Sequence, residues 1–144
     1  MTSQTNHYLP AGLPAPEPTE LDRPYWEAAT RHELAVQVCQ ACGSKQFPPE
    51  EICATCRTFD PGWTTVPPKG RLESWTRIWH PVHPALIGAG PYLVAVVALD
   101  EHPGIRLEGN LLGDVMTNPP IDAPVEAVFE DHDGYTLVQW RLVE

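Results

Sequence analysis

Hydrophobic and polar residues alternate through most of the second half of the chain, a pattern typical of β-strands with one buried face. The pattern predicts five strands, over residues 70–80, 92–99, 105–112, 125–130 and 135–143. A segment containing Asp133-Gly134 separates the last two, and Asp-Gly is a strong signal for a tight hairpin. Five strands without a long helix predict a small closed barrel over residues 67–144.

The first two predicted strands differ in their expected burial. In the first, strict alternation would place Leu72, Ser74, Thr76 and Ile78 on one face, with Glu73, Trp75, Arg77 and Trp79 on the other. The second strand is continuously apolar, which predicts that it is deeply buried. A barrel of five such short strands is of the OB-fold type.

Residues 1–33 are predicted to form an arm followed by a short helix. Prolines at positions 10, 14, 16 and 18 exclude regular helix and central strand, so residues 1–20 should be extended. This arm is either disordered or lies along a partner or its own domain. Asp22 as N-cap and Pro24 in the first turn predict a helix over 23–33, with Tyr25, Trp26 and Ala29 on its apolar face.

Four cysteines, the only ones in the sequence, form two C-x2-C pairs. Each pair places two thiolates on one tight turn, and the two turns together close a tetrahedral cage around zinc, with ligands Cys39, Cys42, Cys53 and Cys56. Disulfides and an iron site are the alternatives. Because all four ligands are protein thiolates, the zinc would be structural and would supply the folding energy of a rubredoxin-like zinc ribbon over residues 34–66.

The charge of the chain bears on its partners. Nine basic and 19 acidic residues give a net charge of −10, which repels phosphate backbones and argues against nucleic-acid binding. A base-stacking role for Trp75, Trp79 and Trp140 remains the alternative. The sequence contains no run of about 18 apolar residues, so it predicts no membrane span. Met1 to His7 do not resemble a targeting signal, and a cytoplasmic protein is therefore expected.

No catalytic constellation is evident in the sequence. His80 and His83 suit proton transfer, but without a nearby acid or nucleophile they are better explained as ordinary loop residues. The acidic run Glu130 to Asp133 looks like a metal cluster, but we expect its side chains to be solvated in the hairpin turn.

The combination of an N-terminal helix, two cysteine pairs and a barrel resembles the DUF35 family. The resemblance covers about residues 21–143 and rests on Tyr25-Trp26-Glu27, Glu33-Leu34, Gln37-Val38-Cys39, Cys42-Gly43, Phe47-Pro48-Pro49, Cys53 to Cys56, Gly70 to Ser74, Pro91-Tyr92, Leu99-Asp100 and Pro124 to Phe129. It implies a zinc ribbon followed by an OB-fold. It also implies a non-catalytic accessory subunit of a thiolase-superfamily enzyme acting on acyl-CoA, an acyltransferase or a lipid-transfer-protein-like aldolase of steroid side-chain degradation. A nucleic-acid-binding module, an acyl-CoA carrier and a stand-alone acyl-CoA enzyme using His80 and His83 are the alternatives.

Two surface sites are expected on this basis. Leu86 and Ile87, in the loop over residues 80–91, would contact the partner enzyme unless they cap the barrel. Arg71 and Arg77, with Lys69 nearby, are the closest grouping of basic residues in the sequence of the barrel. We expect the two arginines to contact the phosphates of a CoA thioester that the chain shares with its partner. The two arginines are an even number of residues apart, so a regular strand would place them on one face.

Overall fold

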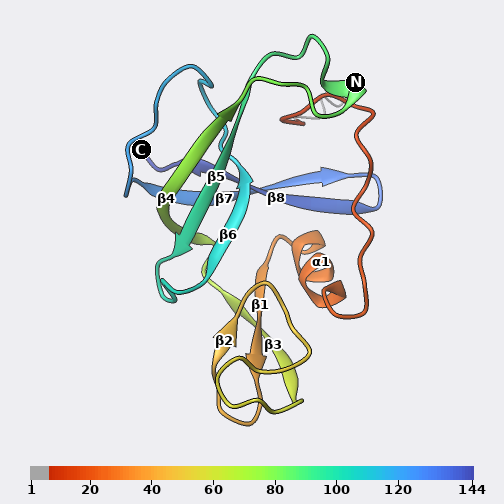
Figure 1. Cartoon of the computed structure of the whole chain (residues 1–144), viewed down its shortest axis with the longest axis vertical. Helices are drawn as coiled ribbons and strands as arrows, with labels where there is room; N and C mark the ends of the chain where they lie inside the picture. The colour runs from red at the N-terminus through yellow and green to blue at the C-terminus, as the bar shows by residue number, and fades with distance from the viewer. Residues whose placement is uncertain (1–6) are drawn as a thin grey trace.

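The computed structural model describes residues 7–144, so the first six residues of the predicted arm lie outside the described part. Figure 1 shows a mostly β molecule with one short helix near the N-terminus. In chain order, the elements are α1 (Arg23–Thr30), β1 (Leu34–Cys39), β2 (Lys45–Gln46), β3 (Pro61–Val66), β4 (Lys69–Ile78), the 3-10 turn η1 (Pro84–Leu86), β5 (Tyr92–Leu99), β6 (Arg106–Asn110), β7 (Pro124–His132) and β8 (Tyr135–Leu142).

The strands form two antiparallel sheets. The smaller has the order β2-β1-β3 and carries the cysteines, and the larger has the order β6-β5-β4-β7-β8. The larger sheet closes on itself where Leu111, just after β6, bridges to Trp140 in β8, and the Leu112 N–H donates to the Trp140 carbonyl at 2.8 Å. An N-terminal helix, a ribbon and a five-stranded OB-fold barrel were the predicted fold class, which is confirmed.

The barrel and the ribbon share one hydrophobic core. Trp140 is fully buried at the closure of the barrel, and Leu72, Val97 and Leu107 pack in the same cluster. Ala29 of α1 and Leu34 and Val36 of β1 belong to it as well. The helix therefore lies between the two sheets and attaches the ribbon to the barrel (Figure 1).

The alternation of β4 is interrupted by a β-bulge. Leu72 pairs with Val97 and Ser74 pairs with the next residue, Val96, so Glu73 has no partner of its own in the register with β5. Beyond the bulge the faces exchange, and Trp75 rather than Ser74 packs against the core. The expectation that Leu72, Ser74, Thr76 and Ile78 share one face is therefore wrong.

Strand β5 occupies the predicted residues but is buried on one face only. Leu93, Ala95, Val97 and Leu99 are buried, whereas the alternate residues are half-buried. The expectation of a deeply buried strand is wrong in this respect. The outer face of β5 thus presents half-exposed apolar side chains, among them Val94 and Val96.

Helix α1 ends at Thr30, three residues before the predicted end, and His32 follows with φ 58°. Asp22 stands at the N-cap position, but its side chain makes no capping hydrogen bond and instead accepts from the Thr19 N–H at 2.6 Å. Tyr25 packs on Phe47 of the ribbon with ring centroids 5.2 Å apart, and burial raises the pKa of Tyr25 to about 12.

Strand β3 was not predicted, because Pro61-Gly62 looks like a chain break. It pairs along the whole of β1, from Leu34 opposite Val66 to Cys39 opposite Pro61. Proline is tolerated there because it is the first residue of the strand.

The described part of the arm lies along its own barrel. The Tyr8 N–H donates to the Glu130 carboxylate in β7, and the Tyr8 hydroxyl accepts from the Leu93 N–H at 3.4 Å. The chain then runs past the tip of the β7–β8 hairpin to α1 (Figure 1). Among residues 7–144, no helix is long and apolar enough to cross a membrane.

Candidate functional site

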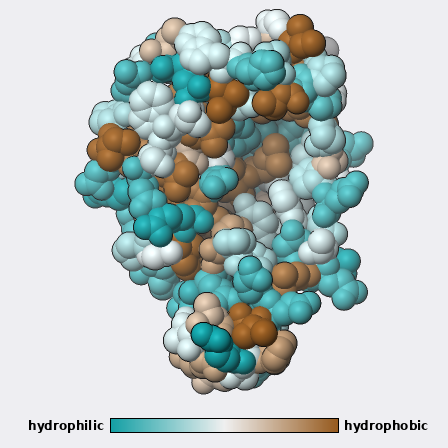
Figure 2. All heavy atoms as spheres, viewed as in Figure 1, coloured by the Kyte–Doolittle hydropathy of each residue, from teal (hydrophilic) through white to brown (hydrophobic). Residues whose placement is uncertain are grey.

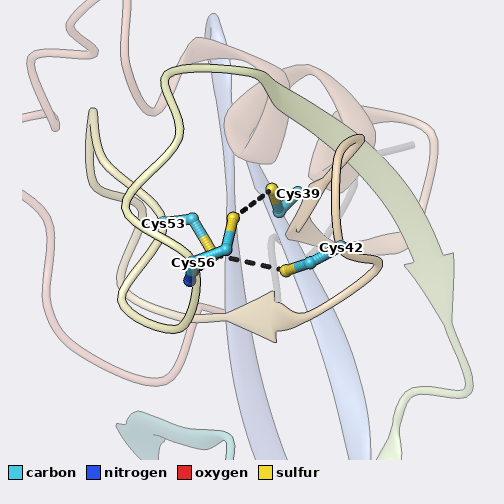
Figure 3. A group of neighbouring side chains, drawn as sticks. All are labelled: Cys39, Cys42, Cys53 and Cys56. Carbon is cyan, nitrogen blue, oxygen red and sulfur yellow. Dashed lines mark hydrogen bonds between the residues drawn. The ribbon is translucent and has the colours of Figure 1, made fainter.

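The four cysteines converge on one point at the end of the ribbon (Figure 3). Cys39 ends β1 and Cys42 follows in a turn, in which the Gly43 N–H donates to the Cys39 carbonyl and Gly43 has φ 76°. The second pair is built alike, with the Arg57 N–H donating to the Cys53 carbonyl at 3.0 Å. Both turns therefore point their thiols toward each other.

The distances between the sulfurs fit a tetrahedral metal cage. All four Sγ atoms lie within 4.8 Å of one another, and the Cys39–Cys56 and Cys42–Cys53 pairs are each 3.6 Å apart (Figure 3). Zinc–sulfur bonds of about 2.3 Å in a tetrahedron place the sulfurs about 3.8 Å apart. A disulfide requires an S–S bond of about 2.05 Å, so these pairs fit ligation and not oxidation.

Hydrogen bonds favour the thiolate form at the second pair. The backbone N–H groups of Cys56 and Thr55 lower the pKa of the Cys53 thiol to about 6, and the Thr58 hydroxyl lowers the pKa of Cys56. At Cys42, the Ser44 N–H lowers the pKa, but burial and the three neighbouring cysteines outweigh it and raise the pKa to about 12. A divalent cation resolves this conflict, because it stabilises all four thiolates together.

A pair of glutamine side chains, the buried Gln37 and the half-buried Gln46, holds the second cysteine turn against the sheet. The Gln37 side chain in β1 donates to the Glu50 carbonyl at 2.7 Å and accepts from the Glu50 N–H at 3.0 Å. Gln46 in β2 donates to the Gln37 side chain at 2.7 Å and accepts from the Ala54 N–H at 3.0 Å. The sequence analysis gave neither residue a hydrogen-bonding role, although a glutamine between Val36 and Val38 in an apolar strand is a signal of one.

The two arginines proposed for CoA lie on opposite faces of β4. The bulge at Glu73 leaves Arg71 on the outer face, while Arg77 lies on the same face as Trp75. The expectation that they share a face is wrong. Arg71 donates to the Asp122 carbonyl and lies 3.9 Å from Asp100.

Arg77 is engaged by the loop that follows β6. Its guanidinium donates to the Val115 carbonyl at 2.7 Å and to the Asn118 side chain at 3.0 Å, and it lies over the Trp75 ring. These bonds hold the loop against the sheet.

The two residues proposed for partner contact, Leu86 and Ile87, lie in the loop between β4 and β5 but differ in their exposure to solvent. Leu86 lies in η1 and is only 5% exposed, whereas Ile87 is 72% exposed. The expectation that Leu86 is exposed is wrong, because the 3-10 turn directs it inward. Trp79 and Val82 are also exposed in this loop.

Among the histidines and tryptophans considered as candidates in the sequence analysis, some have structural roles. The His83 side chain accepts from the Ala85 N–H at 3.1 Å and caps η1, and His80 is exposed. Trp140 is fully buried and Trp75 donates to the Pro119 carbonyl, so the three tryptophans do not form a stacking surface.

Glu130 lies in β7, outside the hairpin turn, and is only 7% exposed. The expectation that this acid is solvated is wrong. Glu130 and His132 are two residues apart on one strand, which puts them on one face, and their side chains are 2.9 Å apart. Their spacing in the sequence was the signal that could have found this pair.

Family models match both parts of the chain. The model of the rubredoxin-like zinc ribbon domain of ChsH2 matches residues 26–62, and that of the C-terminal OB-fold domain of ChsH2 matches residues 63–130. With the sulfur geometry, this match makes the cysteine cage a structural zinc site. The model boundary falls within β3, which the structure pairs with β1 of the ribbon.

Named relatives and a solved structure support the same assignment. The chain is 38% identical over 127 residues to a probable enoyl-CoA hydratase alpha subunit of Thermomonospora curvata, matching 86% of this chain and 38% of the relative. It is 28% identical over 150 residues to the 3-oxo-4,17-pregnadiene-20-carboxyl-CoA hydratase alpha subunit of Mycobacterium tuberculosis, matching 93% of this chain and 46% of the relative. The chain thus spans less than half the length of either.

A chain in the solved structure of the Ltp2-ChsH2(DUF35) aldolase is similar along nearly its whole length. The match has a TM-score of 0.78 and 32% identity, and covers 89% of this chain and 98% of that chain.

Proposed function

The chain belongs to the DUF35 family, and on that premise we propose that it is a non-catalytic accessory subunit that binds and supports a thiolase-superfamily enzyme acting on acyl-CoA. The observation that carries this proposal is the similarity over 98% of a chain found in an aldolase complex. That similarity extends over 89% of this chain and so includes both the ribbon and the barrel.

The metal centre supports a structural rather than a catalytic role. Zinc in a catalytic site keeps an open position for water or substrate, whereas four cysteine ligands complete a tetrahedron. The partner enzyme, in this proposal, performs the chemistry of the complex.

The partner we propose is a lipid-transfer-protein-like aldolase of steroid side-chain degradation, or an acyltransferase. The names of two similar proteins support an aldolase partner and an acyl-CoA substrate: one is an aldolase, and the other is the alpha subunit of a hydratase named for a pregnadiene carboxyl-CoA. Nucleic acid is a poor ligand for a chain with a net charge of −10.

The proposed contact with the partner is the loop over residues 79–91. Trp79, Val82 and Ile87 expose large apolar side chains within this one loop. Solvent-exposed apolar groups gathered in one segment are typical of protein interaction sites.

Replacing Ile87 by serine should weaken the complex with the partner enzyme about tenfold or more, since an apolar side chain of this size contributes about 1.5–3 kcal/mol when buried. The melting temperature should not change, because Ile87 is exposed in the isolated chain. Affinity measured by calorimetry or pull-down of the co-expressed pair checks this.

Two variants serve as controls. Phe59→Ser removes an equally exposed apolar residue from the ribbon and should leave the affinity unchanged. Leu86→Ser should instead lower the stability by about 2–4 kcal/mol, since Leu86 is buried. Unchanged affinity for Ile87→Ser would reject this loop as the contact.

The isolated chain should bind CoA weakly or not at all. Phosphates need cations, and Arg71 and Arg77 already bond to backbone carbonyls while Asp100 lies beside Arg71. We propose that these arginines contact a CoA thioester only together with further binding groups that the partner enzyme supplies. Calorimetry with CoA should show binding only in the complex, and tight binding by the chain alone would make it a carrier in its own right.

A further inference from the structure

A cavity of about 480 Å³ lies between the arm and the β7–β8 hairpin. Figure 2 shows this face hollowed between the arm and the barrel, with hydrophobic residues in the hollow. Leu9, Leu13 and Leu137 contribute apolar walls, together with Pro10, Pro14 and Pro16. The volume is within the range of about 300–1,000 Å³ of small-molecule sites.

The cavity has one buried carboxyl group, that of Glu130, which is held in place by hydrogen bonds to its neighbours. Glu130 is 7% exposed, and its carboxylate accepts from the Tyr8 N–H on one oxygen. Its other oxygen lies 2.9 Å from His132 Nε2 and 3.5 Å from Gln139 Nε2. The Tyr8 N–H and the Gln139 amide N–H can only donate, so both oxygens of the Glu130 carboxyl group act as acceptors.

Glu130 in turn fixes the orientation and the tautomer of His132. Because both carboxylate oxygens accept hydrogen bonds, Nε2 is the ring nitrogen that donates to Glu130, and in the tautomer with its proton on Nε2 the other nitrogen, Nδ1, is an acceptor. His7 stacks on the ring at 3.8 Å and Tyr135 at 4.6 Å, so only the edge of the imidazole can meet a ligand. Within residues 7–144, Nδ1 makes no hydrogen bond of its own.

We propose that this cavity binds an apolar molecule that carries one hydrogen-bond donor, a hydroxyl or an amine, and that His132 Nδ1 accepts that hydrogen bond. The proposal does not depend on the partner enzyme. Asp133 is the other charged residue of the lining, which includes neither lysine nor arginine, so a carboxylate or a phosphate ester is excluded from the ligand class.

Two probes of the same shape test the donor requirement. 2-Naphthol has the hydroxyl, and 2-methoxynaphthalene has the same rings without a donor. Each is titrated at pH 7.5 into the full ¹⁵N-labelled chain, and the imidazole nitrogens are followed by long-range ¹H–¹⁵N correlation. Before titration, the spectrum should show His132 protonated at Nε2.

2-Naphthol should shift the Nδ1 resonance of His132 saturably and bind about fivefold more tightly than 2-methoxynaphthalene, as expected for one hydrogen bond. The resonances of His80, which is outside the cavity, are the internal control. Leu137→Trp fills the cavity and should abolish binding of both probes. His132→Phe keeps the stacked ring but removes Nδ1, and should abolish the preference for 2-naphthol.

Each contrary outcome overturns the proposal. Equal affinity for the two probes would show an apolar hollow without an acceptor. Absence of binding, or an unchanged 2-naphthol titration in Leu137→Trp, would show that the cavity is not the site.

Discussion

Replacing Cys53 by serine is expected to unfold the zinc ribbon while most of the barrel keeps its β-structure. The cysteine turns have few buried side chains around them, so the metal supplies the folding energy, which for structural zinc is about 10 kcal/mol or more. Removing one of four thiolates breaks the tetrahedral cage. Metal analysis measures the loss of zinc, and hydrogen exchange on the same sample measures the unfolding of the ribbon.

Hydrogen exchange in the Cys53→Ser chain should differ between the ribbon and the barrel. The amides of Gly43 and Arg57, which close the two turns, should lose protection, whereas those of β5 and β7 should keep most of theirs. Thr55→Ala changes a residue between two ligands without removing a thiolate, and should retain zinc. A Cys53→Ser chain that lacks metal but keeps the protection of Gly43 and Arg57 would contradict this account.

Replacing Gly70 by alanine is expected to destabilise the barrel by about 3 kcal/mol or more. A Cβ at this position of β4 would lie 2.2 Å from the Ala98 carbonyl oxygen and 2.8 Å from a Val97 methyl group. The backbone of β5 must therefore move, and overpacking that a flexible side chain cannot relieve is among the costlier core changes. Urea unfolding of the zinc-loaded chain measures the loss.

Gly104→Ala is the matched control for this change. Its Cβ meets nothing within 4 Å, and the same substitution there should be neutral or slightly stabilising. Equal stability of the two variants would mean that β4 and β5 are not packed as closely as the structure places them.

The parts of the fold that depend on short sequence patterns were predictable. The cysteine pairs fix the metal site because a C-x2-C turn has a narrow range of geometries, and the Asp133-Gly134 turn fixes the last hairpin. Resemblance to a family added the expectation of a partner enzyme, which neither the cysteine spacing nor the alternation gives.

What could not be predicted depended on contacts between distant residues. The bulge at Glu73 exchanges the faces of β4 without any local signal, since the neighbouring residues continue to alternate. Glu130 is hydrogen-bonded by the Tyr8 N–H of the arm, more than 100 residues away in sequence, a contact that no local pattern predicts. Burial of Leu86 likewise follows from the 3-10 turn that His83 caps.

The central claim is that this chain supports a partner's chemistry without performing its own. The direct measurement is acyl-CoA turnover by a co-expressed candidate enzyme of the thiolase superfamily, assayed alone, with this chain, and with an Ile87→Ser chain. A His80→Ala, His83→Ala double variant tests whether the loop histidines take part in the reaction.

Turnover should be low for the enzyme alone and undetectable for this chain alone. It should be restored by the wild-type chain and by the double histidine variant, and reduced with Ile87→Ser at limiting concentration. A monodisperse partner that is fully active without this chain, or turnover by this chain alone, would contradict the account.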